Sequence, residues 1–218
     1  DLHSFPTRRS SDLWSSLLHQ SGFLGVIVVA AALTARQQSA ADRLGMPVIT
    51  IDPTETLPPG SVSVGATNWN GGLEATTHLI GLGHRRIAFL GGPTSSVPSM
   101  ERYQGYLSAL AMHGVSRDEA LATFGPFAYE TGLREGRRLL SLPEGERPTA
   151  VFAASDTTAI GVYEAARERG LMIPTDLSVF GFDDCDIASW TTPGLTTVHQ
   201  PLELQRSEER RVGKECRS

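Results

Sequence analysis

Short apolar runs alternate with amphipathic stretches of helical length along most of the chain. The first run, 26–30, is a continuous β-branched segment of the kind found in buried parallel strands. The stretch that follows Thr34 repeats apolar residues at helical spacing, with Thr34 as its N-cap. The strands predicted in this way are 26–30, 47–51, 62–64, 86–90, 120–124, 150–153, 177–182 and 195–198. The predicted helices are 35–44, 68–82, 100–113, 130–142 and 156–169.

This alternation predicts an α/β fold with parallel sheets and helices on both faces. Gly91-Gly92-Pro93 breaks the pattern, and we interpret it as a crossing between two lobes. The expected lobes are therefore residues 14–92 and 93–199. In such folds ligands bind beyond the carboxyl ends of the strands, so chemistry is expected there.

The two ends of the chain follow neither the helical nor the strand period. Residues 1–13 and 207–218 resemble adaptor-derived, non-native sequence, and we leave both out of the fold prediction. The alternative for the tail is a basic arm that binds nucleic acid. Acidic residues interspersed with its basic ones argue against that interpretation.

Composition narrows the class of protein. The 218 residues are 40% hydrophobic and 20% charged, and no apolar run approaches the roughly 20 residues of a membrane span. No secretory signal is recognised at the start. Two cysteines, Cys185 and Cys216, suggest a reducing compartment, and no Cys/His spacing indicates a metal site. A net charge of −5 is a poor footprint for phosphate binding.

Four predicted strand ends are followed by polar or aromatic groups, in the segments 65–72, 91–102, 154–156 and 183–184. Structural explanations exist for several of them. Asp156 fits a helix N-cap. Arg102 alone fits a solvated helix residue, while Trp69, Phe127 and Trp190 taken singly fit core positions.

Asp183 and Asp184 look like a catalytic carboxylate pair. Adjacent residues on an extended segment point to opposite sides, however, so they need not share a site. One could face a cleft while the other caps a short helix at 186–190. Other enzyme signatures are missing: Gly81-Leu82-Gly83 lacks the spacing of a dinucleotide loop, and no Walker motif or Gly-x-Ser-x-Gly elbow occurs.

Five segments in register resemble the LacI/GalR family of bacterial transcription regulators. The Gly-His-Arg-Arg-Ile-Ala stretch at 83–88 and the Arg-x-x-Gly helix at 102–105 resemble two family motifs. Pro-Thr-Ala-Val-Phe-Ala-Ala-Ser-Asp at 148–156, Ile-Pro-x-Asp to Phe-Asp-Asp at 173–184 and Pro-Gly-Leu-Thr-Thr at 193–197 resemble three more. The resemblance runs from about Trp14 to Gln205.

The resemblance implies two Rossmann-like lobes of the periplasmic-binding-protein-like type I, with the first lobe incomplete and residues 200–206 crossing back to it. It implies a small-molecule effector between the lobes, with a sugar favoured over a purine base, and a cytoplasmic homodimer. Operator DNA would be read by an N-terminal helix-turn-helix that this chain lacks. It implies no enzyme activity, cofactor, metal or membrane contact. The first strand and helix of the first lobe, and a helix after Gln205, are expected to be missing.

The resemblance also suggests ligand-binding residues. Arg102 falls where the family clamps effector hydroxyls or carboxylates, and Asp183 where a carboxylate accepts from sugar hydroxyls. Phe127 matches a stacking aromatic, and Asn70 stands where many members carry an acid. The full set expected at the ligand is Trp69, Asn70, Arg102, Phe127, Ser155, Asp183, Trp190 and Gln200.

Two rival functions remain at this point. A periplasmic sugar-binding protein of a transporter would have the same fold without a DNA role. An α/β enzyme using Asp183 and Asp184 would lose turnover on Asp183→Ala, where a regulator would lose only binding, by about 1–3 kcal/mol.

Overall fold

A computed structural model describes residues 24–29, 31, 33–65 and 67–200 of the chain. The described residues form two compact units, one ending at Gly65 and the other starting after it. The predicted non-native segments 1–13 and 207–218 and most of the predicted crossover 200–206 lie outside the described residues. In the described part of the chain, no helix is long and apolar enough to cross a membrane.

The first unit contains a small parallel sheet in the order β1-β2-β3. Its elements are β1 (Val26–Val29), α2 (Ala35–Arg43), β2 (Val48–Ile51) and β3 (Val62–Val64). Helix α2 begins as predicted, because the Thr34 side chain accepts from the Gln37 amide while the Gln37 side chain caps Thr34 in return. The buried residues Ala40 and Ala41 pack against the apolar residues of β1 and β2.

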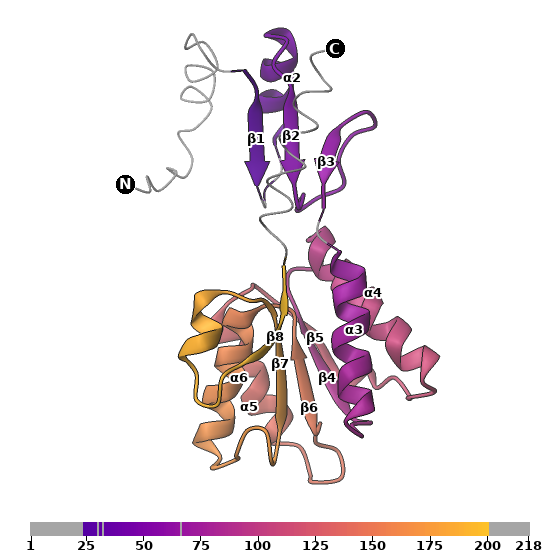
Figure 1. The fold of residues 1–218 in the computed structure, drawn as a ribbon, viewed down its shortest axis with the longest axis vertical. Helices are drawn as coiled ribbons and strands as arrows, with labels where there is room; N and C mark the ends of the chain where they lie inside the picture. Colours follow the sequence, from indigo (N-terminus) through magenta and orange to yellow (C-terminus); the bar gives the residue numbers. More distant parts are fainter. Residues whose placement is uncertain (1–23, 30, 32, 66, 201–218) are drawn as a thin grey trace. The chain divides into compact units, whose positions relative to one another are not determined.

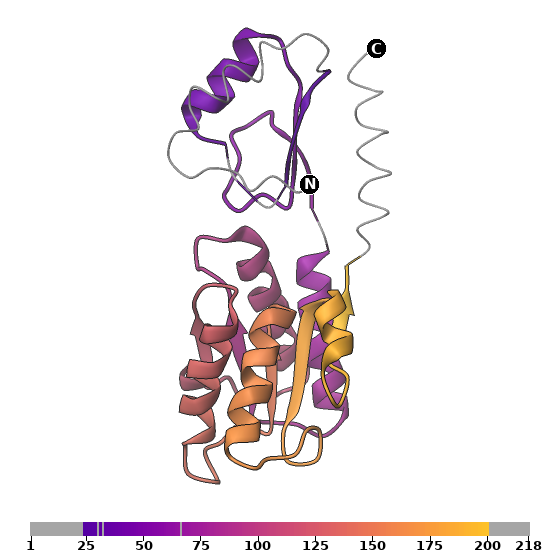
Figure 2. The same cartoon turned by 90° about the vertical axis from the view of Figure 1, so that its left-hand side faces the viewer.

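The second unit is a parallel five-stranded sheet in the order β5-β4-β6-β7-β8. Figures 1 and 2 show α3 and α4 on one face of this sheet and α5 and α6 on the other. Its helices are α3 (Asn68–Gly81), α4 (Val97–Met112), α5 (Tyr129–Leu140) and α6 (Asp156–Glu168), with short 3-10 helices η1 (Glu119–Leu121) and η2 (Asp186–Trp190). Its strands are β4 (Ile87–Gly91), β5 (Ala122–Phe124), β6 (Ala150–Ala153), β7 (Ser178–Asp183) and β8 (Thr196–His199).

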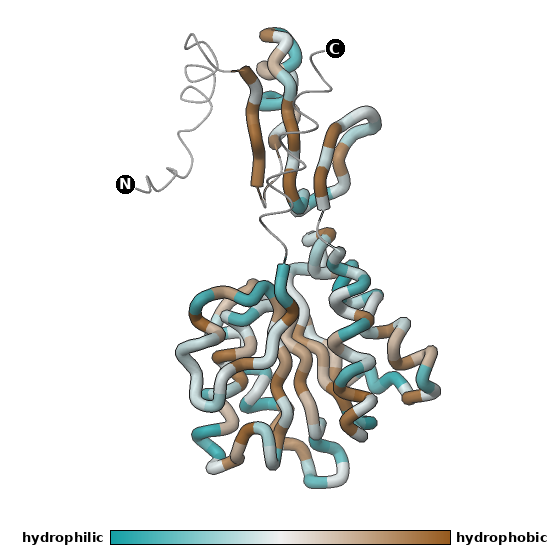
Figure 3. The backbone as a smooth tube through the Cα atoms, viewed as in Figure 1, coloured by the Kyte–Doolittle hydropathy of each residue, from teal (hydrophilic) through white to brown (hydrophobic). Residues whose placement is uncertain are grey.

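The central strands β4, β6 and β7 are largely hydrophobic along their length, as the brown parts of the tube in Figure 3 show. Ile87 and Phe89 of β4 pack with α3 and α4, whereas Ala88 and Leu90 pack with α5 and α6. A strand buried on both sides needs apolar residues at every position, which explains the continuous runs in the sequence.

Glycines bring the helices of each face into backbone contact. A Cβ at Gly72 of α3 would lie 2.3 Å from the carbonyl oxygen of Arg102 in α4. A Cβ at Gly132 of α5 would fall on the backbone of Thr158 in α6. Gly105 and Gly161 make the reciprocal contacts. Only residues without a side chain allow helices to approach this closely.

The predicted lobe boundary at 92/93 is wrong. Helix α3 packs on α4, and β4 lies between β5 and β6, so both belong to the second unit. The division between the units falls after β3, at Gly65. Residues 67–92 therefore extend the unit that was expected to begin at residue 93.

Some element boundaries also differ from prediction. Ser155, not Asp156, is the N-cap of α6, because its hydroxyl accepts from the Thr158 amide. Helix α4 begins at Val97 rather than Met100, with Ser96 as its N-cap. The predicted strand 120–124 is a 3-10 turn followed by the three residues of β5.

Candidate functional site

A buried arginine lies at the carboxyl ends of β6 and β7. Arg102, in the second turn of α4, is only 5% exposed, and its Nη2 lies 3.3 Å from Asp183 Oδ1. Asp183 is the last residue of β7, and the same oxygen accepts a 2.6 Å hydrogen bond from Gln200 Nε2. Three of the residues predicted at the ligand therefore meet at the predicted edge of the sheet.

The guanidinium of Arg102 is held on several sides. Its Nε donates to Asn68 Oδ1 of α3 at 2.9 Å, and its Nη1 donates to the carbonyl oxygen of Ala154 at 2.6 Å. The guanidinium carbon lies 3.7 Å from the centroid of the Phe182 ring and 5.8 Å from the centroid of the Phe127 ring. Hydrogen bonds and ring faces together offset the cost of burying the charge.

The segment after β7 carries two aspartates with unusual backbone. Asp183 has φ +110° and Asp184 has φ +54°. Positive φ is unfavourable for every residue except glycine, so this backbone is strained. Their side chains contact different partners, an outcome that the sequence alone left open. Asp184 Oδ2 lies 2.8 Å from His199 Nδ1 instead of capping η2, whose N-cap is Cys185.

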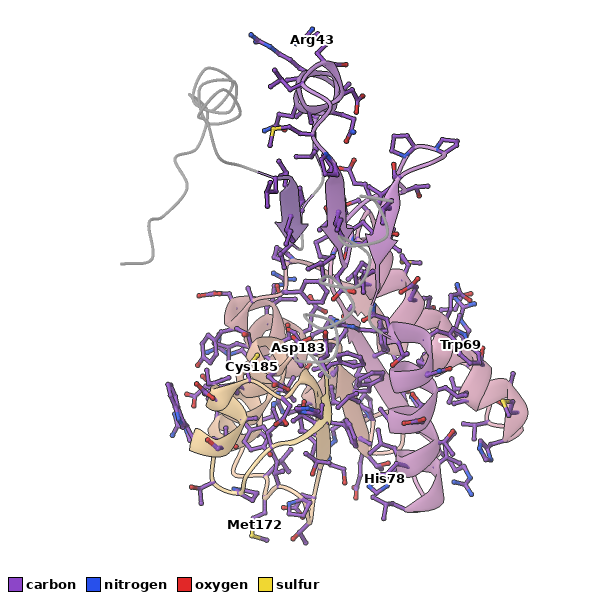
Figure 4. All side chains as sticks on the ribbon, turned by 45° about the horizontal axis from the view of Figure 1, so that its top comes forward. Arg43, Trp69, His78, Met172, Asp183 and Cys185 are labelled. Carbon is purple, nitrogen blue, oxygen red and sulfur yellow. The ribbon has the colours of Figure 1, made fainter. Side chains whose placement is uncertain are left out.

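The remaining predicted residues are placed differently. Trp69 and Asn70 are exposed on α3, and Trp190 is 75% exposed in η2, so neither tryptophan is in the core. Phe127 is also partly exposed, at 38%. Figure 4 shows Asp183 and Cys185 at the carboxyl ends of the strands and Trp69 on the outer side of α3. Ser155 is buried beside Ala154, where its hydroxyl caps α6.

Two residues at Arg102 were not predicted. Asn68 lies 34 positions before Arg102, and nothing in its local pattern marks it beyond the start of a helix. Phe182 was expected only as a strand residue, although its place directly before Asp183 could have indicated the site. In the part of the chain that the structure describes, no group of three or more His, Cys, Asp or Glu side chains could hold a metal ion.

The comparisons with known proteins identify the family to which this fold belongs. Residues 76–205 match the model of the periplasmic binding protein-like domain. The chain is 39% identical over 173 residues to the HTH-type transcriptional regulator CelR of Thermobifida fusca, covering 78% of this chain and 50% of that protein. It is 42% identical over 131 residues to the ribose operon repressor of Escherichia coli K12, covering 60% of this chain and 39% of the repressor.

A solved structure of a transcriptional regulator CelR-cellobiose complex is also similar. It shares 34% identity and a TM-score of 0.81, over 92% of this chain and 61% of that one. The chain belongs to the family of periplasmic binding protein-like domains, in the form of a LacI/GalR-type effector-binding core. It spans about half the length, or less, of the curated relatives that it matches.

Proposed function

We propose that this chain is the ligand-sensing part of a DNA-binding transcriptional regulator and that its effector is a sugar. The observation that carries the proposal is the cluster of buried Arg102 and Gln200 with the partly exposed Asp183 at the carboxyl edge of the sheet. A guanidinium and a carboxylate give strong, directional hydrogen bonds to hydroxyl groups. The partly exposed ring of Phe127 offers an apolar face of the kind that covers a pyranose.

The relatives support the same class of ligand. One is described as a complex with cellobiose, and another is a ribose operon repressor. Since these relatives are regulators, we propose that the chain acts by binding and not by catalysis. A homodimer that binds operator DNA in the cytoplasm, through a domain outside this chain, completes the proposal. A transporter's sugar-binding protein is the alternative, and the regulator relatives favour the first function.

Calorimetric titration of the chain with cellobiose and with D-ribose tests the proposal. We expect one of these sugars to bind and to raise the melting temperature, because ligand bound only to the folded state stabilises it. Asp183→Asn should weaken that binding by about 10-fold or more, as expected for a lost charged hydrogen bond. Binding of purine bases with no response to either sugar would contradict a sugar effector.

Asp118→Asn is the matched control. Asp118 also pairs with an arginine, Arg86, but at the opposite edge of the same sheet. Its substitution should leave sugar affinity unchanged. In the full-length protein, the sugar should change operator affinity by shifting the population of two states. Equal operator affinity with and without a sugar that binds would contradict the regulatory role.

A further inference from the structure

The carboxylate of Asp156 is buried beneath the turn that follows β7. Asp156 is the first residue of α6 and is 1% exposed. One carboxylate oxygen accepts from the backbone amide of Cys185 at 2.8 Å, and the other accepts from Thr197 Oγ1 at 2.5 Å. Burial raises the pKa of Asp156, and these two hydrogen bonds oppose that rise. The carboxylate thus connects α6, β8 and the turn.

The turn needs such support because of its backbone. Asp183 and Asp184 both have positive φ, so their conformation persists only where surrounding contacts hold it. The Asp184 amide donates, at 3.4 Å, to the same Thr197 hydroxyl that donates to Asp156. Asp156 therefore holds two consecutive amides of the turn, one directly and one through Thr197.

The strand leaves room for this carboxylate at Gly181. A Cβ at Gly181 would lie 2.3 Å from Asp156 Oδ1. Any larger residue at 181 would displace the carboxylate from the position where it meets Thr197 and Cys185. Gly181 in β7 is thus required because a side chain at this position would collide with the Asp156 carboxylate.

We propose that Asp156 is a positioning residue for Asp183: with Thr197 it fixes the left-handed turn that points the Asp183 carboxylate at Arg102 and Gln200. The part of this inference that concerns ligand affinity rests on the proposed sugar-binding function. The part that concerns the turn does not, because it refers only to the order of residues 183–185.

Hydrogen exchange of the Asp184 and Cys185 amides tests the turn directly. Exchange should be at least about 10-fold faster in Asp156→Asn, which keeps one acceptor where the carboxylate offers two. Thr197→Val should accelerate the Asp184 amide, while Thr197→Ser, which keeps the hydroxyl, should restore the slow rate. Unchanged exchange in both Asp156→Asn and Thr197→Val would overturn the proposal.

Thr123→Val is a matched control for Thr197→Val. Among the residues described, Thr123 Oγ1 is a buried hydroxyl oxygen with no hydrogen-bond partner, and it lies on β5 of the same sheet. The same change there should leave exchange at residues 184 and 185 unaltered. If Asp156→Asn fails to fold, as judged by circular dichroism, the Thr197 variants alone decide the outcome.

A double-mutant cycle then tests whether Asp156 acts through Asp183. With the sugar that binds the wild type, cellobiose or D-ribose, Asp156→Asn should weaken affinity about 5- to 10-fold. In the Asp183→Ala background the same change should have no further effect. Additive losses would overturn the positioning role. If neither sugar binds the wild type, the proposed function fails, and the exchange experiment still decides the inference.

Discussion

Two arginine–aspartate pairs lie at opposite edges of the same sheet. They have the same chemical groups but differ in burial and in the contacts around them. The Arg102–Asp183 pair is at the carboxyl edge, with side chains 6% and 30% exposed and 3.3 Å between Nη2 and Oδ1. The Arg86–Asp118 pair is at the amino edge, with both side chains 37% exposed and 3.1 Å between nitrogen and oxygen. The shorter of the two distances therefore belongs to the more solvated pair.

We infer from this difference that the surroundings of such a pair, rather than the distance between its charges, set how much it contributes to stability. Arg86 also donates to the carbonyl oxygen of Glu146, and water screens the charges on both sides of the pair. Arg102 is enclosed by Asn68, Ala154 and the ring of Phe182, so its charge depends on protein groups alone. Only the second pair has a buried guanidinium, which is the feature on which the proposed ligand site rests.

The largest expected difference comes from removing each arginine. Arg102→Ala should lower the free energy of unfolding by about 3 kcal/mol, because it leaves buried polar partners without their donor. Arg86→Ala should cost about 1 kcal/mol or less, as for exposed pairs. Urea denaturation of both variants measures the two values. Equal losses would contradict the contrast between the pairs.

Replacing each arginine by lysine should give a smaller difference of the same sign. Lysine keeps the charge but lacks the planar fork that reaches Asn68, Ala154 and Asp183 together. Arg102→Lys should therefore cost about 1–2 kcal/mol in unfolding free energy. Arg86→Lys should be close to neutral in the same experiment. If Arg102→Lys is also neutral, the positive charge alone, and not the planar guanidinium, accounts for the contribution of Arg102 to stability.

Salt should weaken the coupling within one pair and not within the other. A double-mutant cycle on Arg86 and Asp118 should give a coupling free energy of about 0.2–1 kcal/mol at low salt. That coupling should vanish near 1 M salt, where the screening length is about 3 Å. The coupling of Arg102 with Asp183, measured likewise, should persist at the same salt concentration. Loss of both would mean that solvent reaches the buried pair.

The smallest effect concerns a histidine at the amino edge. His84 bridges Thr149 Oγ1 and Ser178 Oγ through its two ring nitrogens, each at 2.9 Å, and burial lowers the pKa of His84 from 6.5. Its neutral form is therefore favoured in the fold. The stability this provides is present above pH 6.5 and is lost as the pH falls through the lowered value.

The difference in unfolding free energy between the wild type and His84→Gln should accordingly shrink as the pH falls from about 8 to about 5. The Arg102 and Arg86 variants should show no such trend near neutral pH, since arginine stays charged. If the difference in unfolding free energy stays constant over this range, protonation of His84 does not affect the stability that its two hydrogen bonds provide.

Much of the fold follows from sequence periodicity, and the main error has a physical explanation. The apolar runs located every described strand, and the pattern is clearest for β4 and β6, which are buried at every position. Gly91-Gly92 was interpreted as a crossing between lobes. In the structure a Cβ at Gly92 would lie 2.1 Å from the ring of Phe127, and one at Gly91 would meet Phe124. These glycines make room for aromatic rings, and local sequence cannot distinguish that from a hinge.

The site was predicted in part. Family resemblance and strand ends pointed to Arg102 and Asp183, which form an ion pair in the structure, while their contact with a ligand stays a prediction. Asn68 was missed because its contact depends on how α3 and α4 pack, which no periodicity encodes. The cap of α6 was placed one residue late, since Ser155 and Asp156 are both good N-caps and only the tertiary contacts of Asp156 separate them.

The glycine contacts between paired helices have a mechanical consequence. Where Gly72 meets the backbone of α4, no side chains lie between the helices to act as a deformable layer. A displacement of α4 at Arg102 is therefore expected to move α3 with it, and Gly132 and Gly161 bring α5 and α6 equally close. Each helix pair of the second unit is therefore expected to shift as one body, because sliding one helix past the other would first require the two backbones to separate.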